Sequence, residues 1–232
     1  MPKRSEGQVK RWGGKGKKWR MKLLDDQDLA GITRYALSAA RYHWDGMRYY
    51  TEQMKNSGTK DDSKEYTKKF QTYFNKFYHN LRAFFWELTA AFDTLLQEIN
   101  RRFFLGIDES DVRWDTVSKA LSGQRKYKRF LSRLSEGYSS PWFTEVREYR
   151  NFAHRGTVAV EAMAIDSELH PEAGVQFGGM MLRPLARGRG AGEPIALCKE
   201  YGTQVRELIL WALEELDSLA PSEKSNRPSA TE

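Results

Sequence analysis

The residues of this chain that could perform chemistry lie in one short segment, REYRNFAHRG, at positions 147–156. The candidates are four polar side chains, Arg147, Arg150, Asn151 and His154. At about 100° per residue on a helical wheel, these four fall within an arc of roughly 100°. Apolar side chains of the same stretch fall on another side, and they are Trp142, Val146, Tyr149 and Ala153. The sequence therefore predicts a helix over residues 141–154 that buries one face and presents the four polar side chains on another.

These side-chain types suit the metal-independent cleavage of RNA. Such cleavage needs a base for the ribose 2′-hydroxyl, an acid for the leaving 5′-oxygen, and positive charge beside the phosphorane. A histidine can take or give a proton at neutral pH, and a guanidinium binds two phosphoryl oxygens while staying charged. Asn151 could bond a phosphate oxygen or hold the imidazole tautomer. A two-fold dimer would supply the second proton-transfer group, because every catalytic residue then appears twice.

A second interpretation gives the same residues a structural role. Cations in the last turn of a helix complement the helix dipole, and a histidine at that end is often a cap. His43 and His79 lie in aromatic helical stretches and are interpreted as packing or surface residues. No His, Asp or Glu cluster has metal-ligand spacing, so neither a metal nor a cofactor is expected.

Long helices must position this segment. Residues 24–56 repeat one stripe at mostly three- and four-residue steps, and its members are Ile32, Tyr35, Ala36, Ala39, Tyr42 and Met47. A second stripe runs from residue 70 to residue 103 and is about 45 Å long on a helix. Because a stripe of this length must face a partner helix, the sequence predicts a long antiparallel helix pair.

The rest of the chain predicts a mainly α fold, a helical bundle with a small β-hairpin inserted before the last helix. Shorter helices are expected over 112–121 and 124–136, and the last helix over 195–219. Alternating apolar residues predict two strands over 157–165 and 174–184, which form the hairpin. The predicted domains are a basic disordered tail at 1–23, a helical domain at 24–219 with its hairpin insertion at 157–184, and a disordered tail at 220–232.

The composition excludes several classes of protein. Of the 232 residues, 40% are hydrophobic, which is enough to build a core. The sequence contains no run of about 18 apolar residues, so no transmembrane helix is predicted. The basic N-terminus lacks the apolar stretch of a signal peptide. A single cysteine, Cys198, excludes an intramolecular disulfide and a cysteine-based zinc cluster. We therefore expect a cytoplasmic protein that does not bind a membrane.

The positive charge of the chain is concentrated in its N-terminal tail. The whole chain carries +7, but residues 1–22 hold nine Lys or Arg and one Glu, or +8, which leaves −1 for the rest. Such a tail could hold phosphates by charge and stack bases on its indoles. The expected nucleic-acid-binding residues are Lys10, Arg11, Trp12, Lys15, Lys17, Lys18, Trp19 and Arg20. The alternative is a disordered, solubilising extension.

The combined pattern resembles the HEPN superfamily (higher eukaryotes and prokaryotes nucleotide-binding domain). Many of its members are metal-independent endoribonucleases of toxin–antitoxin, CRISPR and antiphage systems. The segment at 79–104, HNLRAFFWELTAAFDTLLQEINRRFF, is similar to the leading helical hairpin of that family. The segment VREYRNFAHRG resembles its motif helix, with an Arg-Asn pair before the histidine. The resemblance covers about 24–219.

The resemblance implies His154 as general acid or base, two arginines that bind the phosphate, and Asn151 as the orienting residue. The family signature places four to six residues between Arg and His, often with Asn directly after Arg. Arg147 matches by spacing, whereas Arg150 matches by its Asn neighbour, with three residues before the histidine. Both arginines therefore remain candidates for the catalytic position.

Two functions follow from these patterns. The first is a homodimeric HEPN-type endoribonuclease of prokaryotic defence or a toxin–antitoxin system, which cleaves single-stranded RNA to a 2′,3′-cyclic phosphate. Its expected partners are RNA and an antitoxin or another defence-system protein. The alternative is a non-catalytic helical module that binds nucleic acid or protein through the basic tail.

Overall fold

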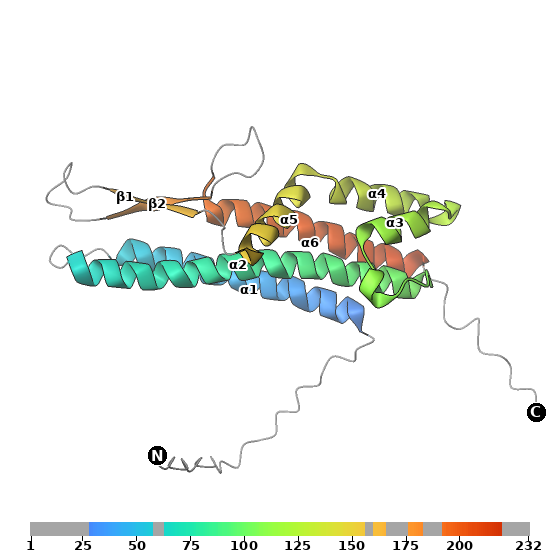
Figure 1. Ribbon diagram of the computed structural model, residues 1–232, viewed down its shortest axis with the longest axis horizontal. Coiled ribbons are helices and arrows are strands. Elements are labelled where there is room, and N and C mark those ends of the chain that lie inside the picture. The colour runs from blue at the N-terminus through green and yellow to red at the C-terminus, as the bar shows by residue number, and fades with distance from the viewer. Residues whose placement is uncertain (1–27, 58–62, 156–159, 166–175, 183–191, 220–232) are drawn as a thin grey trace, which may run out of the picture.

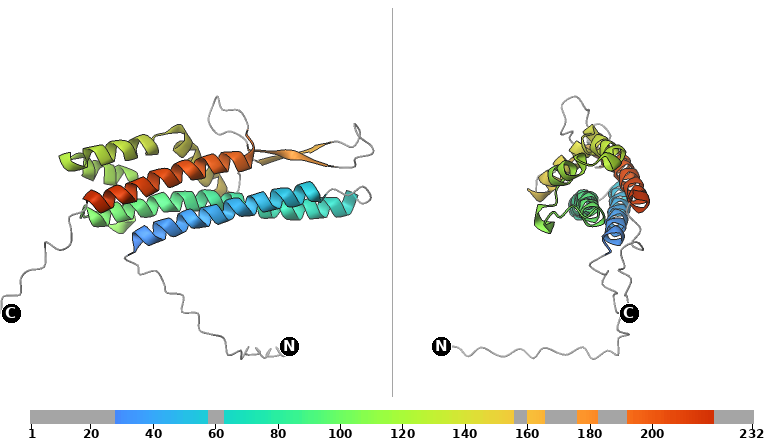
Figure 2. Two further views of the ribbon diagram at one scale, coloured as in Figure 1. Left: turned by 180° about the vertical axis from the view of Figure 1, so that it is seen from behind. Right: turned by 90° about the vertical axis from the view of Figure 1, so that its right-hand side faces the viewer.

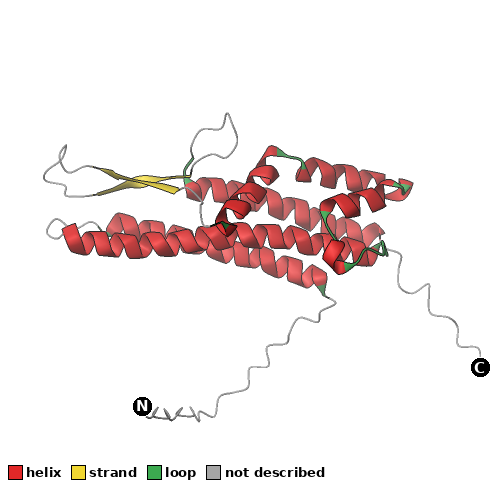
Figure 3. Cartoon of the chain, in the orientation of Figure 1, coloured by secondary structure: helices red, strands yellow, loops and turns green. Residues whose placement is uncertain are grey.

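The computed structural model describes residues 28–57, 63–155, 160–165, 176–182 and 192–219. This part of the chain is mainly helical, which confirms the predicted mainly α class, and Figure 3 shows one pair of strands beside the helices. None of its helices combines the length and the apolar character needed to cross a membrane. The elements in chain order are α1 (Leu29–Asn56), α2 (Ser63–Arg102), η1 (Glu109–Asp111), α3 (Trp114–Ser122), η2 (Arg125–Tyr127), α4 (Lys128–Tyr138), α5 (Pro141–His154), β1 (Val160–Ile165), β2 (Gln176–Leu182) and α6 (Pro194–Leu219).

Helices α1 and α2 lie side by side along most of their length (Figures 1 and 2). His43 of α1 contacts Asn80 of α2 through a 3.0 Å hydrogen bond, and Tyr50 stacks on Tyr73 with ring centroids 6.4 Å apart. The buried residues of α1 recur at three- and four-residue steps, and they are Ala30, Thr33, Ala36, Ala40, Trp44, Met47, Thr51 and Met54. This stripe fixes which face of α1 meets the bundle.

The structure corrects the predicted apolar face of α1. Tyr35 and Tyr42 are 66% and 72% exposed, although the sequence interpretation places both in the buried stripe. A tyrosine counts as apolar in a periodicity analysis, but its hydroxyl is satisfied by water at no cost, so the ring tolerates the surface. The smaller Ala36 and Ala40 take the buried positions and allow close packing.

Helix α2 is the central element of the bundle. In the end-on view of Figure 2 it lies inside an arc formed by the other helices, and it contacts α1, α3, α5 and α6. Neighbouring residues of α2 are buried together, as in the pairs Phe84–Phe85 and Leu95–Leu96. A helix that buries adjacent positions is covered on several sides, because successive side chains point about 100° apart.

Helix α5 spans the predicted residues. Ser140 caps it by accepting a hydrogen bond from the Phe143 backbone N–H at 3.3 Å, and Pro141 occupies its first turn. The predicted helix over 124–136 is instead the short 3₁₀ helix η2 followed by α4, and α3 starts two residues later than expected. Helix starts are hard to place from sequence because the terminal turns of a helix are held by few backbone hydrogen bonds.

Strands β1 and β2 pair antiparallel, from Val160 opposite Leu182 to Ile165 opposite Gln176, with an irregularity between Met163 and Ala164. Leu182 is fully buried and bridges to Gly192, just before α6. The end of the strand pair that contains Val160 and Leu182 therefore lies against the helices.

Several expectations fall outside the described residues. These include the N-terminal tail at 1–23 with all eight of its predicted nucleic-acid-binding residues, and the C-terminal tail at 220–232. The segment 166–175 between the strands also lies outside.

Candidate functional site on helix α5

The buried face of α5 fixes the orientation of the helix. Tyr149 is 2% exposed and stacks on Phe85 of α2 with ring centroids 4.8 Å apart. Glu145, also buried, accepts a hydrogen bond from the Tyr201 hydroxyl of α6. Because aromatic stacking and a buried hydrogen bond hold α5 from two neighbouring helices, its polar face is held in one direction.

Two of the four predicted site residues, Arg150 and His154, contact one indole, that of Trp86 on α2, and Asn151 is hydrogen-bonded to Arg150. The Arg150 guanidinium lies over this ring, with Cζ 4.7 Å from the centroid. The His154 imidazole meets it edge to face, with ring centroids 5.7 Å apart and an interplanar angle of 70°. Arg150 Nη1 donates to Asn151 Oδ1 at 3.3 Å. Trp86 therefore brings a guanidinium, an amide and an exposed imidazole to one surface region.

Arg147 contacts a different aromatic ring, that of Tyr138. Its Cζ is 4.1 Å from the ring centroid of Tyr138, and its Nη2 donates a long 3.4 Å hydrogen bond to Thr144 Oγ1. It lines a hollow with Asp93 and Trp114, which come from α2 and α3. The two arginines thus share a helix face but contact different aromatic rings, and only Arg150 shares its ring with His154.

Neither guanidinium group has a carboxylate partner in the part of the chain that the structure describes. Within the described residues, neither Arg147 nor Arg150 has an acidic oxygen within 4.0 Å. Both side chains are half-buried, and the Nε–H of each is covered by neighbouring atoms and meets no acceptor. Among the described residues each group makes one long bond to a neutral oxygen, so its other Nη–H donors meet no acceptor there. Arginines that lie over aromatic rings and have no counter-ion are well suited to receive an anion.

Asp93 of α2 interacts electrostatically with Arg150. Although the residue is exposed as a whole, burial around its carboxyl group raises the pKa above its ordinary value, and the charge of Arg150 opposes that rise. A carboxylate here would repel a bound phosphate, so the burial that disfavours its charged form also favours an anion site.

Replacing Asp93 by Asn tests this electrostatic arrangement. The pKa of Asp93 is raised in the folded state. The contribution of this residue to the free energy of unfolding is therefore favourable at low pH and is lost as the pH rises through that pKa. Asp93→Asn cannot ionise, so it should melt at a higher temperature than the wild type at pH 7. The difference should vanish as the pH falls toward the ordinary carboxyl value of 3.8.

Thermal unfolding at a series of pH values measures this effect. Asp108→Asn is the matched control, since its exposed side chain makes no capping hydrogen bond. A variant at position 93 that melts below the wild type at pH 7 would show that the carboxylate stabilises the fold.

Sequence reasoning did not identify the residues that complete the site. Trp86, Asp93 and Tyr138 come from α2 and α4, and no spacing within the motif helix points to them. The apolar stripe of α2 gave one usable signal, because Trp86 interrupts it as a large aromatic residue outside the three- and four-residue steps. Such a residue on a packed helix often serves a neighbouring element.

Comparison of the chain with protein families, curated proteins and solved structures gives no match. In the part of the chain that the structure describes, no three His, Cys, Asp or Glu side chains gather closely enough to hold a metal ion. The function is therefore argued from the site itself.

Proposed function

We propose that this chain is a metal-independent endoribonuclease of HEPN type, which cleaves single-stranded RNA at the polar face of α5. One observation carries the proposal: two half-buried guanidinium groups, with no carboxylate partner among the described residues, lie on the same helix face as an exposed imidazole. This combination supplies anion binding and proton transfer in one place. The resemblance in sequence suggests a setting in prokaryotic defence or a toxin–antitoxin system.

The proposed reaction needs no group beyond those of the protein and the RNA. One imidazole takes the proton of the ribose 2′-hydroxyl, and the resulting oxygen attacks the adjacent phosphorus. The P–O5′ bond breaks, and a second acid protonates the leaving oxygen, which gives a 2′,3′-cyclic phosphate and a 5′-hydroxyl. Arg150 binds the phosphoryl oxygens and stabilises the added negative charge, while Asn151 orients Arg150 through their hydrogen bond.

The second acid would come from His154 of another copy in a two-fold dimer. The outer face of α5 offers a surface for such a contact, because Phe152 is 37% exposed and lines a shallow hollow with Glu148 and Arg155. Two copies related by a two-fold axis could pair Glu148 of each with Arg155 of the other around the two phenyl rings. That contact would bring both histidines to one substrate strand.

The test is cleavage of a single-stranded RNA by the purified chain in the presence of EDTA, followed by analysis of the product ends. We expect cleavage to persist and to leave 2′,3′-cyclic phosphate and 5′-hydroxyl ends. A strict requirement for a divalent cation, or products with 5′-phosphate ends, would contradict the proposal. Sedimentation at the assay concentration should show a dimer.

The two arginines should differ in what their removal costs. Arg150→Gln should lower kcat by about 10²–10³-fold, because its guanidinium lies beside His154 and stabilises charge that develops in the transition state. Arg147→Gln should chiefly raise KM, because its separate aromatic contact suits it to hold the strand in the ground state as well. Steady-state kinetics of both variants on one substrate separates these effects, and a larger kcat loss at position 147 would reverse the assignment.

A second candidate function is a non-catalytic nucleic-acid-binding module. The observation in its favour is that both arginines are packed against rings, which suits binding without chemistry. This alternative expects salt-sensitive RNA binding that is lost on deletion of residues 1–22 and is insensitive to His154→Ala. Binding with no cleavage under any condition would select it.

A further inference from the structure

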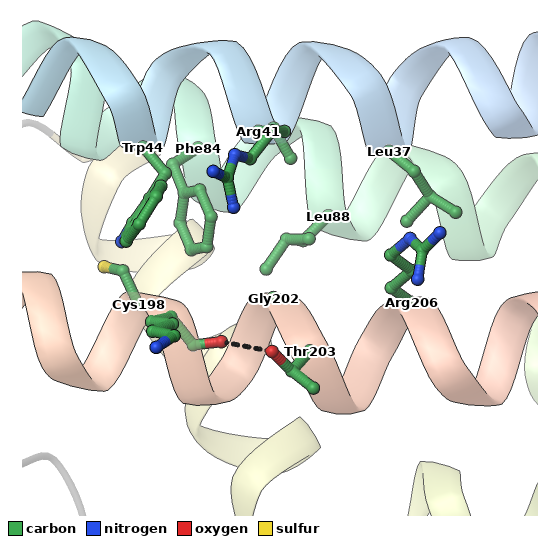
Figure 4. A pocket seen from close by; sticks show the side chains of 11 residues that line it. Leu37, Arg41, Trp44, Phe84, Leu88, Cys198, Gly202, Thr203 and Arg206 are labelled. Carbon is green, nitrogen blue, oxygen red and sulfur yellow. Dashed lines mark hydrogen bonds between the residues drawn. The ribbon is translucent and has the colours of Figure 1, made fainter.

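Helix α6 lies alongside α1 (Figure 2), and a groove lined by residues of both helices runs between them. It consists of two adjoining hollows of about 120 and 610 Å³, which share Leu37, Arg41, Thr203 and Arg206. The floor is apolar and includes Phe84, Leu88 and Cys198, and burial raises the pKa of the Cys198 thiol. Figure 4 shows Arg41 and Arg206 extending from the two helices into the space between them.

All charged side chains that line the groove are cations. They are Arg34 and Arg41 from α1, and Lys199 and Arg206 from α6. Arg41 forms a 3.1 Å ion pair with Asp45, whereas the other three form no ion pair within the described residues. Unpaired cations on both walls of an open groove indicate an anionic occupant.

Helix α1 carries a regular repeat of Arg-Tyr pairs, of which Arg34 and Arg41 line the groove. The pairs are Arg34-Tyr35, Arg41-Tyr42 and Arg48-Tyr49, each seven residues after the one before. Seven residues are close to two helical turns, so the pairs lie on one side of α1 at intervals of about 10 Å. The three tyrosines are 66%, 72% and 58% exposed. A row of open aromatic rings thus runs beside a row of guanidinium groups.

We propose that this surface, formed by the α1–α6 groove and the three exposed tyrosines, binds a single strand of RNA. Guanidinium groups bind phosphates, and tyrosine rings stack bases without regard to sequence, which is how extended single strands are held. A second copy of this chain is disfavoured, because a two-fold contact would place the cationic row of each copy against that of the other. A rigid duplex would keep its bases paired and leave the tyrosines without partners.

The polar groups of the groove favour RNA over DNA. Ser38 and Thr203 line it, and their hydroxyls donate to the backbone oxygens of Arg34 and Lys199 at 3.0 and 2.9 Å. Each hydroxyl oxygen can therefore still accept a hydrogen bond. A phosphate offers no donor, whereas the ribose 2′-hydroxyl does, and only RNA carries it.

RNA binding at this surface does not depend on RNA cleavage at α5. Its test uses the full chain with His154→Ala throughout, so that binding is measured whether or not the wild type cleaves RNA. The probe is a fluorescent oligouridylate of twelve nucleotides, with the same oligodeoxyuridylate as comparison, and the readout is fluorescence anisotropy over a range of salt concentrations. We expect the ribose strand to bind more tightly, and equal affinities would overturn the assignment to RNA.

The contribution of the groove's cations to RNA binding is tested by one triple variant, which combines Arg34→Gln, Lys199→Gln and Arg206→Gln. Since each lost phosphate contact reduces the slope of log K against log salt by about 0.7 for single strands, the slope should fall by roughly 2. The matched control removes three exposed cations from α3 and α4, as Lys119→Gln, Lys128→Gln and Arg129→Gln. The N-terminal tail is present in both variants. Equal slopes in the two variants would overturn the proposal.

The aromatic contribution is tested by changing the three tyrosines to Ala, and separately to Phe. The Ala variant should bind the RNA roughly 30-fold or more weakly with an unchanged salt slope, because base stacking is lost while charge remains. The Phe variant keeps the rings and should retain most of the affinity. An Ala variant that binds RNA normally but loses self-association would show that the tyrosines serve a contact between copies, and the proposal would fall.

Discussion

Replacement of His154 by Ala should lower the rate of single-stranded RNA cleavage by about 10²–10⁴-fold, the range that a positioned acid or base contributes. The imidazole is exposed and touches the edge of Trp86, so it can reach a substrate. Its loss should change the free energy of unfolding by less than about 0.5 kcal/mol, as is usual at exposed positions. The expected signature is therefore a large loss of rate without a loss of stability.

The matched control is His79→Ala, which removes an exposed histidine from α2 without touching α5. It should cleave RNA at the wild-type rate, which excludes a general effect of histidine removal. The measurement is the initial rate of cleavage in EDTA, with thermal unfolding of both variants alongside. Equal rates for His154→Ala and the wild type would contradict the assigned role of this residue.

The second large effect is expected at Phe85, where α5 is anchored to α2. Phe85 is fully buried, stacks on Tyr149 at 4.8 Å and lies 6.3 Å from the ring of Tyr201. Phe85→Ala removes these contacts and leaves a cavity where three helices meet. The free energy of unfolding should fall by about 3–5 kcal/mol.

Urea denaturation measures this loss, and Phe104→Ala is the control. Phe104 is 80% exposed, so the same substitution there removes almost no buried surface and should leave the urea midpoint nearly unchanged. A loss below about 1 kcal/mol at Phe85 would show that α5 is held mainly by its other contacts.

Phe85 and Trp86 are adjacent in the chain but serve different parts of the site. Phe85 points into the core and supports the buried face of α5, whereas Trp86 contacts Arg150 and His154 on the polar face. Successive helical residues point about 100° apart, so α2 contacts both sides of α5 with neighbouring side chains. Partial loss of stability should therefore also loosen the arrangement around Trp86.

The amino-acid sequence by itself determined the mainly helical class and the bounds of α5. Both depend on local information, namely the repeat of apolar residues, the serine cap and the proline in the first turn. It also grouped Arg147, Arg150, Asn151 and His154 on one face, because the geometry of a single helix is known in advance.

Only the tertiary structure decided what surrounds that face. The indole of Trp86 joins Arg150 to His154, and Asp93 lies within electrostatic reach of Arg150. These contacts join residues more than fifty positions apart, and they depend on how helices dock rather than on how each one forms. No periodicity within one segment contains that information.

The Arg-Tyr repeat of α1 also combines information from the sequence with information that only the tertiary structure provides. The spacing is visible in the sequence, but counting tyrosine as apolar assigned Tyr35 and Tyr42 to the core. The structure turns Ala36, Ala40 and Trp44 toward the bundle and leaves the tyrosines exposed. The sequence determined that these residues share a side of the helix, and tertiary packing decided that this side faces the solvent.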